Sequence, residues 1–237
     1  MRWACSTCCV VPSLRGGQMS LNAFLASAAV LKLDGVELAA EHLPTLRWEY
    51  LATLRQQIQE NDLALAAVTW TLPPTPERVE CETLAQALQI AHQLGAHALC
   101  LSGVNDWRPY AEKVAAIAGQ AEAWGMPVAL FWAHECGDPE GFLRLLDDLN
   151  SPFVGACLSI ATDLAPTSSQ WDAVAMVAPF AVHVHLRVVH LPTALVWCPA
   201  FELLRECEYA GFVSLVQVPE PPEEMLPVIL SQLRRLV

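Results

Sequence analysis

The sequence predicts one parallel α/β barrel of eight strands, with residues 1–237 in a single domain. Short apolar runs alternate along the chain with longer segments of helical spacing, and this alternation is typical of parallel strands joined by crossover helices. Eight such units favour a closed barrel over an open doubly wound sheet, and barrels of this kind usually contain about 250 residues. No linker or change of composition divides the chain, so we expect one core.

The first unit illustrates the reasoning for each element. Residues 3–10 are small and apolar and are followed by Pro12, Gly16 and Gly17, a pattern that predicts a strand and then a loop. Ser20 is a typical helix N-cap before apolar residues at helical spacing, so a helix is predicted over 21–32. The apolar segment 34–39 is the predicted second strand.

The same patterns predict the remaining elements in order. The predicted helices cover 45–61, 75–94, 109–124, 139–149, 169–177, 200–209 and 222–236. The predicted strands cover 63–70, 97–102, 127–132, 153–159, 180–187 and 213–218. Together with the first unit, these segments make eight strands and eight helices.

The charge balance excludes several classes of partner. The chain has 13 Lys and Arg residues against 25 Asp and Glu residues, a formal net charge of -12, whereas nucleic acids and anionic membranes attract clustered positive charge. No segment reaches the roughly 20 apolar residues of a membrane-spanning helix, and the first residues do not resemble a signal peptide. We therefore expect a cytoplasmic protein with no nucleic-acid or membrane partner.

Nine cysteines are present, and most lie in apolar segments. An odd number of cysteines fits a reducing compartment better than a disulfide framework. Cys5, Cys8 and Cys9 were considered as a metal or redox motif, but the second ligand pair of a zinc site and the helix start of a redox motif are both missing. We expect the cysteines to be small core residues.

The predicted strand at 180–187 carries the clearest polar signal. Side chains of a strand alternate between two faces, so His183, His185 and Arg187 point to the same side. In a parallel barrel, the polar space that could take them is the mouth at the carboxyl ends of the strands, where active sites lie. His185 is predicted to lie inside the barrel near this mouth, with His183 deeper.

Four segments resemble the xylose-isomerase-like barrels, a superfamily of sugar isomerases and epimerases. They are 33–38 (Leu-Asp-Gly-Val-Glu-Leu), 149–155 (Leu-Asn-Ser-Pro-Phe-Val-Gly), 183–187 (His-Val-His-Leu-Arg) and 201–212. The resemblance implies a xylose-isomerase-like (β/α)8 TIM barrel. It also implies that ordinary members hold one divalent metal, such as Mn, Mg, Co or Zn, with two glutamates, an aspartate and a histidine. That metal polarises the sugar carbonyl while carboxylates move a proton.

Most of the metal ligands that the resemblance implies are replaced in this sequence. The glutamate of the fifth strand falls on Phe131 or Trp132, the aspartate of the sixth on Ser159, and the glutamate of the eighth on Val216. Only His185 matches a ligand. One imidazole does not hold a hard ion that prefers several oxygen ligands, so we expect no bound metal and no other cofactor.

Several residues near predicted strand ends remain candidates for contact with a ligand. The ligand-binding candidates are Glu37, Trp70, Trp132, His134, His185 and Arg187, and the catalytic candidates among them are Glu37, His134 and His185. Glu37 lines the pocket or, as an alternative, is a buried carboxylate paired with Arg187 or a histidine. Further polar candidates are Glu135, Asp163, Gln217 and Glu220, and Trp107 is a further aromatic one.

Three functions stay open from the sequence. The first is a relative that lacks the metal chemistry and binds a small polar, sugar-like molecule or a protein partner. The second is an active sugar or sugar-phosphate isomerase or epimerase with a rearranged site. The third is a structural protein with a filled barrel. The resemblance leaves a homo-oligomer open, since family members often form dimers or tetramers.

Overall fold

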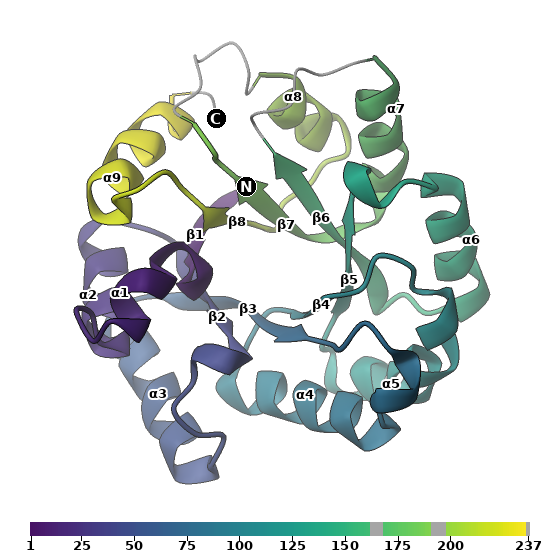
Figure 1. Ribbon diagram of the computed structural model, residues 1–237, viewed down its shortest axis with the longest axis horizontal. Helices are drawn as coiled ribbons and strands as arrows, with labels where there is room; N and C mark the ends of the chain where they lie inside the picture. Colours follow the sequence, from purple (N-terminus) through teal and green to yellow (C-terminus); the bar gives the residue numbers. More distant parts are fainter. Residues whose placement is uncertain (162–167, 191–197, 236–237) are drawn as a thin grey trace.

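The computed structural model describes residues 1–161, 168–190 and 198–235. Eight parallel strands form a closed barrel in sequence order, and β8 pairs with β1 to complete the ring. Helices surround the strands on the outside (Figure 1). The predicted fold class, a single (β/α)8 barrel, is confirmed.

The strands lie close to their predicted positions. Their bounds are β1 Arg2–Ser6, β2 Gly35–Ala39, β3 Ala64–Thr71, β4 Leu99–Ser102, β5 Val128–Ala133, β6 Val154–Ala161, β7 Ala181–Arg187 and β8 Phe212–Gln217.

The helices between the strands also follow the prediction, with shifts at their ends. Their bounds are α1 Val11–Arg15, α2 Leu21–Val30, α3 Trp48–Glu60, α4 Cys81–Leu94, α5 Ala111–Trp124, α6 Pro139–Leu149, α7 Ser168–Val177, α8 Cys198–Glu206 and α9 Pro222–Leu233. Short 3-10 turns are η1 Thr7–Val10, η2 Ala40–His42, η3 Pro76–Arg78, η4 Arg108–Tyr110, η5 His134–Cys136 and η6 Ala178–Phe180. Within the described part of the chain, none of these helices is both long and apolar enough to cross a membrane.

The first strand is shorter than predicted, and the prediction of a strand up to residue 10 is wrong. Ser6 ends β1 because its hydroxyl accepts a hydrogen bond from the Cys8 backbone N–H at 3.2 Å and caps η1. The chain then continues into α1, which has Pro12 in its first turn, where a missing N–H costs little. A helical segment therefore stands where the sequence indicated strand and loop.

Small side chains and one aromatic ring close the amino-terminal end of the barrel. Ala4, Ala66 and Phe212 form a buried apolar cluster there. Gly35 is required beside this cluster, because a Cβ at this position would lie 2.6 Å from the Ala64 carbonyl oxygen and 3.0 Å from the Phe212 ring. The buried polar residues of the interior lie in the middle of the barrel and at its carboxyl end.

Candidate functional site

A buried acid–base cluster fills the middle of the barrel. Strand β7 presents His183 and His185 on its inner face, and β2 presents Glu37 across from them. Glu37 Oε2 lies 2.9 Å from His183 Nε2 and 3.1 Å from His185 Nε2. Thr69 Oγ1 donates to Glu37 Oε1 at 2.8 Å, and Ser214 Oγ lies 3.0 Å from His183 Nε2. All five residues are buried.

Burial and the close contacts determine the protonation states of the residues in this cluster. Burial alone would raise the pKa of Glu37, but the charge on His185 and the hydrogen bonds from both histidines hold it well below its usual range. Burial opposes a charge on His185, yet the Glu37 carboxylate raises the pKa of His185 to about 10. Burial lowers the pKa of His183. At neutral pH, an ionised Glu37 therefore pairs with a protonated His185 beside a neutral His183.

Cys100 completes one group of potential metal ligands with the two histidines. The ligand atoms of Cys100, His183 and His185 lie within 4.8 Å of one another. The Nε2 atoms of both histidines already contact Glu37, and burial raises the pKa of the Cys100 thiol well above its usual range. Because thiolates and neutral imidazoles are the metal-binding forms, a metal here would have to displace the thiol proton of Cys100 and the contacts of both histidines with Glu37.

Three strand ends beside His185 carry no carboxylate. Phe131 pairs in register with Cys157, which pairs with His183, so Phe131 faces inward, and its ring centroid lies 6.4 Å from that of His185. Ser159 is the register partner of His185 and shares its inner face. Val216 lies two residues beyond the inward-facing Ser214. An aromatic ring and a hydroxyl thus lie on the inner face near His185, and Val216 lies at the register shift near the end of β8.

The Ser159 hydroxyl has an unusual environment. The residue is fully buried, and its Oγ has no hydrogen-bond partner among the residues that the structure describes. Buried polar atoms in proteins are nearly always paired with protein or ordered water. Ser159 therefore differs from the other buried hydroxyls of the interior, Thr69 and Ser214, which are both paired.

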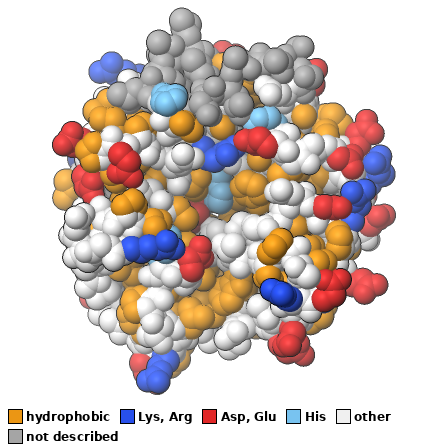
Figure 2. Space-filling view, in the orientation of Figure 1, with side chains coloured by type: hydrophobic (Ala, Val, Ile, Leu, Met, Phe, Trp, Pro, Cys, Tyr) orange, Lys and Arg blue, Asp and Glu red, His pale blue; other side chains and the backbone are white. Residues whose placement is uncertain are grey.

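Charged side chains stand above the cluster at the rim of the mouth. Arg187, at the end of β7, donates a hydrogen bond to Glu135 in η5, and His134 Nδ1 lies 3.1 Å from the other carboxylate oxygen of Glu135. Burial alone would raise the pKa of Glu135, but Arg187 holds it below its usual range. Figure 2 shows histidine, acidic and basic side chains gathered around a hollow near the centre of this face.

The predicted aromatic residues lie away from the inner cluster. Trp70 alternates with the inward-facing Thr69 and Thr71, and it lines an open depression with Glu41 and Leu46. Trp132 is 2% exposed, and its ring centroid lies 6.4 Å from that of Phe142 in α6. Both tryptophans therefore lie on the helical side of the barrel wall.

Trp107 has a supporting position beside β5. It is 2% exposed, and its indole N–H donates to the Phe131 carbonyl oxygen at 2.8 Å. This bond secures the end of the strand that carries Phe131 into the mouth.

The structure brings together three of the predicted ligand-binding residues near the mouth, His134, His185 and Arg187, and places Glu37 beneath them. Gln217, the last residue of β8, and Glu220, three residues beyond it, are both exposed. Asp163 lies outside the described residues. Sequence reasoning missed Thr69 and Ser214 as partners of the cluster, because a hydroxyl in an apolar strand gives no signal of its partner across the barrel.

A second polar patch at the mouth was also missed. Thr71 Oγ1 lies 3.3 Å from Glu41 Oε1 and 3.4 Å from Ser102 Oγ. These residues come from the ends of β3 and β4 and from η2, so their meeting depends on the neighbouring positions of these elements in the barrel. The alternation that places Thr69 inward could have indicated Thr71, but Glu41 is in a turn without such a pattern.

The comparisons with known proteins agree with this architecture. A family model described as xylose isomerase-like TIM barrel matches residues 25–233. A D-psicose 3-epimerase crystallised in the presence of D-fructose superimposes with a TM-score of 0.72 at 15% identity, covering 100% of this chain and 99% of that one. No curated protein has a sequence that matches this chain.

Two further solved structures extend the comparison. A D-allulose 3-epimerase from Methylomonas sp. has a TM-score of 0.74 at 15% identity and covers 100% of this chain and 98% of that one. A probable 3-DHS dehydratase involved in petrobactin synthesis from Bacillus anthracis has a TM-score of 0.74 at 14% identity, with 99% coverage of both chains. At these identities the likeness shows a shared fold.

Proposed function

We propose that this chain, which belongs to the xylose isomerase-like TIM barrel family, has lost the metal-dependent sugar chemistry. We propose further that it binds a small polar, sugar-like ligand at the mouth of the barrel. The observation that carries the proposal is the set of residues at the strand ends, which are the inward-facing Phe131, Ser159 and His185, together with Val216 at the register shift of β8. Two of them offer no side-chain ligand atom at all.

The residues present do not fit the divalent metal that the family resemblance implies. Hard divalent ions take several oxygen ligands with negative charge, whereas Ser159 contributes one neutral hydroxyl. His185 is paired with Glu37, and its raised pKa keeps it protonated and cationic at neutral pH. The Nε2 atom of His185 is thus engaged with Glu37 and is not free for a metal ion.

Glu37 does not supply the base that sugar isomerisation needs. A general base must come within about 3 Å of the proton that it removes. Glu37 is fully buried, and its two oxygens already accept hydrogen bonds from Thr69 and the histidines. Its pKa, held well below the usual range, makes the carboxylate a weak base.

Binding of a polar ligand is supported by the groups that remain at the mouth. The buried Ser159 hydroxyl lacks a partner within the described residues, and Phe131 presents a partly exposed ring beside it. Aromatic rings pack against the apolar faces of sugars while hydroxyl groups give hydrogen bonds. Arg187, Glu135 and His134 provide further polar contacts at the rim.

Calorimetric titration with Mn²⁺, Mg²⁺, Co²⁺ and Zn²⁺ tests the loss of the metal site. We expect no stoichiometric binding at micromolar concentrations, because the three carboxylates are replaced. Binding that disappears in His185→Ala but persists in the rim variant His134→Ala would contradict the proposal and identify a rearranged inner site.

An active isomerase or epimerase with a rearranged site is the second candidate function. The observation that favours it is His134, which lies at the mouth and contacts the Glu135 carboxylate at 3.1 Å, since a carboxylate can orient a histidine for proton transfer. Turnover of a panel of sugars by the unaltered chain and by the His134→Asn variant separates the two functions. An active enzyme turns over a sugar and loses this activity in the variant, whereas a binding protein shows no turnover in either form.

A further inference from the structure

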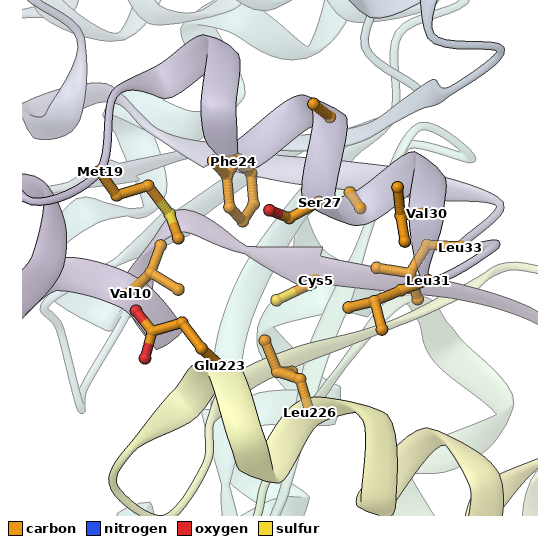
Figure 3. Close-up of a pocket in the computed structure, with 12 residues that line it drawn as sticks. Cys5, Val10, Met19, Phe24, Ser27, Val30, Leu31, Leu33, Glu223 and Leu226 are labelled. Carbon is orange, nitrogen blue, oxygen red and sulfur yellow. The ribbon is translucent and has the colours of Figure 1, made fainter.

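A separate cavity of about 340 Å³ lies outside the barrel, between α2, α9 and strand β1. Figure 3 shows the side chains that surround it, which come from the beginning of the chain and from the last helix. The volume falls within the roughly 300–1,000 Å³ that is usual for small-molecule sites. The cavity is separated from the mouth by the barrel wall, because Cys5 faces outward between the inward Ala4 and Ser6.

The interior of this cavity is apolar. Its deep lining residues are buried, with exposed fractions of 1% for Cys5, 3% for Phe24, 5% for Leu33 and 5% for Leu226. Water is held in protein cavities by about two to four polar partners, and these side chains provide none beyond one thiol. An apolar cavity of this kind favours an apolar guest; one of about 150 Å³ already takes up benzene.

Contacts at both ends of α9 hold this helix beside the cavity. Near the start of α9, the Ser13 hydroxyl donates to Glu223 Oε1 at 2.7 Å. Beyond the end of α9, the Arg234 guanidinium donates to the backbone carbonyl oxygens of Leu31 and Lys32 at 2.8 and 2.6 Å. Helix α9 is thus joined to α1 near its start and to the residues that follow α2 beyond its end.

One charged side chain lines the cavity. Glu223 extends from α9 toward the space between Val10 and Leu226 (Figure 3). Its carboxylate is exposed and lies at the cavity entrance. The charged head group of a ligand could stay in water beside this carboxylate while the alkyl chain of the ligand entered the apolar interior. The chain as a whole carries a net charge of -12, which also favours cations over anions.

We propose that this cavity binds a small aliphatic cation, with the alkyl chain between α2 and α9 and the ammonium head beside Glu223. The buried chain supplies most of the affinity, because apolar surface leaves water. The exposed ion pair contributes a modest preference of about threefold, as surface pairs do. A fatty acid is disfavoured by the same carboxylate, which repels its head group.

Titration of the full chain with octylammonium, octanol and octanoate, followed by calorimetry and NMR, tests the proposal. We expect the amine to bind most tightly, the alcohol about threefold more weakly, and octanoate weakest. In Glu223→Gln, the amine should lose its advantage over the alcohol while the alcohol binds as before. Equal affinity of octanoate and octylammonium for the unaltered chain would overturn the assignment of the head group.

A matched pair of variants on α2 tests the position of the site. Ala28 is 2% exposed and lines the cavity, whereas Ala23 is exposed on the same helix outside it. We expect Ala28→Leu to weaken octanol binding at least tenfold and Ala23→Leu to leave it unchanged. Ser27→Leu, at the cavity rim, gives a second obstruction if Ala28→Leu does not fold. Undiminished binding in the obstructed variants, or no binding to the unaltered chain, would overturn the proposal.

Discussion

Glu37 is the residue on which the interior of the barrel depends most. It is fully buried and lies within 3.1 Å of two histidine side chains. A buried ion pair is costly to break, because removal of one partner leaves the other charge without compensation. Glu37 and His185 therefore link the stability of the whole barrel to pH.

Glu37→Gln is expected to lower the free energy of unfolding by about 3–5 kcal/mol near pH 6. The lowered pKa of Glu37 gives stability that is present above about pH 4.3 and is lost as the pH falls through the folded-state value. The pKa of His185, raised to about 10, gives stability that is complete below about pH 6.5 and is lost as the pH rises toward 10. The difference between the two proteins should therefore shrink from pH 6 to pH 10.

Urea unfolding at pH 6, 8 and 10 measures this difference. Glu135→Gln is the matched control, because Glu135 pairs with Arg187 at the exposed rim, where an ion pair contributes about 0–1 kcal/mol. A constant difference between the Glu37→Gln variant and the unaltered chain across this range would show that His185 does not carry the second charge.

Part of this cluster could be predicted from the residues alone. The alternation in residues 180–187 placed His183 and His185 together, and a histidine was one of the two partners considered for Glu37. The structure shows the histidine pairing, while Arg187 pairs with Glu135 instead. The choice could not be made from the sequence because it depends on distances across the barrel, between strands far apart in the chain.

At the level of single elements, the helices with clear end signals were predicted best. Helix α6 covers Pro139–Leu149, as predicted, because Asp138 caps it and Pro139 suits its first turn. Residues 3–10 were predicted less well, since their small apolar side chains suit a strand and a buried turn equally. The hydroxyl of Ser6, which ends the strand, gave no such signal in an apolar run.

Asp138→Ala tests the cap of α6. The Asp138 carboxylate accepts a hydrogen bond from the Gly141 backbone N–H at 2.8 Å, and its φ of 40° lies in the left-handed region. Loss of such a cap costs about 1 kcal/mol, and the left-handed backbone adds to the cost for alanine. Thermal unfolding should therefore show a lower midpoint.

Asp138→Asn is the control for this cap. Asparagine keeps a capping oxygen and tolerates the left-handed backbone, but it removes the charge near Arg108 and Arg144, each 3.9 Å away and exposed. Retention of most of the stability is expected. An equal loss in both variants would assign the effect to charge and not to the cap.

At the scale of the whole molecule, the order of eight strand–helix units was enough to predict the barrel. The register of the strands was not predictable to one residue, so the sequence left open whether Phe131 or Trp132 faces inward. The pairing of β5 with β6 places Phe131 inward and Trp132 against α6. A shift of one residue exchanges the two faces of a strand, and only the closed sheet determines which residue faces the mouth.

The presence of Phe131 and Ser159 instead of carboxylates at the strand ends near His185 is therefore a feature of the assembled barrel, and its chemical consequence can be measured directly. General acid–base catalysis contributes about 10²–10⁴-fold to a rate, and a catalytic metal stabilises the developing charge by several kcal/mol. Under the proposed function both contributions are missing, and we expect no isomerisation or epimerisation of a sugar at a useful rate.

Incorporation of solvent deuterium into a panel of ketoses, aldoses and sugar phosphates, with and without added Mn²⁺, Mg²⁺, Co²⁺ or Zn²⁺, is the most direct measurement. The account predicts no exchange above the rate of the buffer with any metal. Metal-dependent exchange that persists through repurification and is abolished by His185→Asn would contradict it, because such exchange requires a working metal site at the carboxyl end of β7.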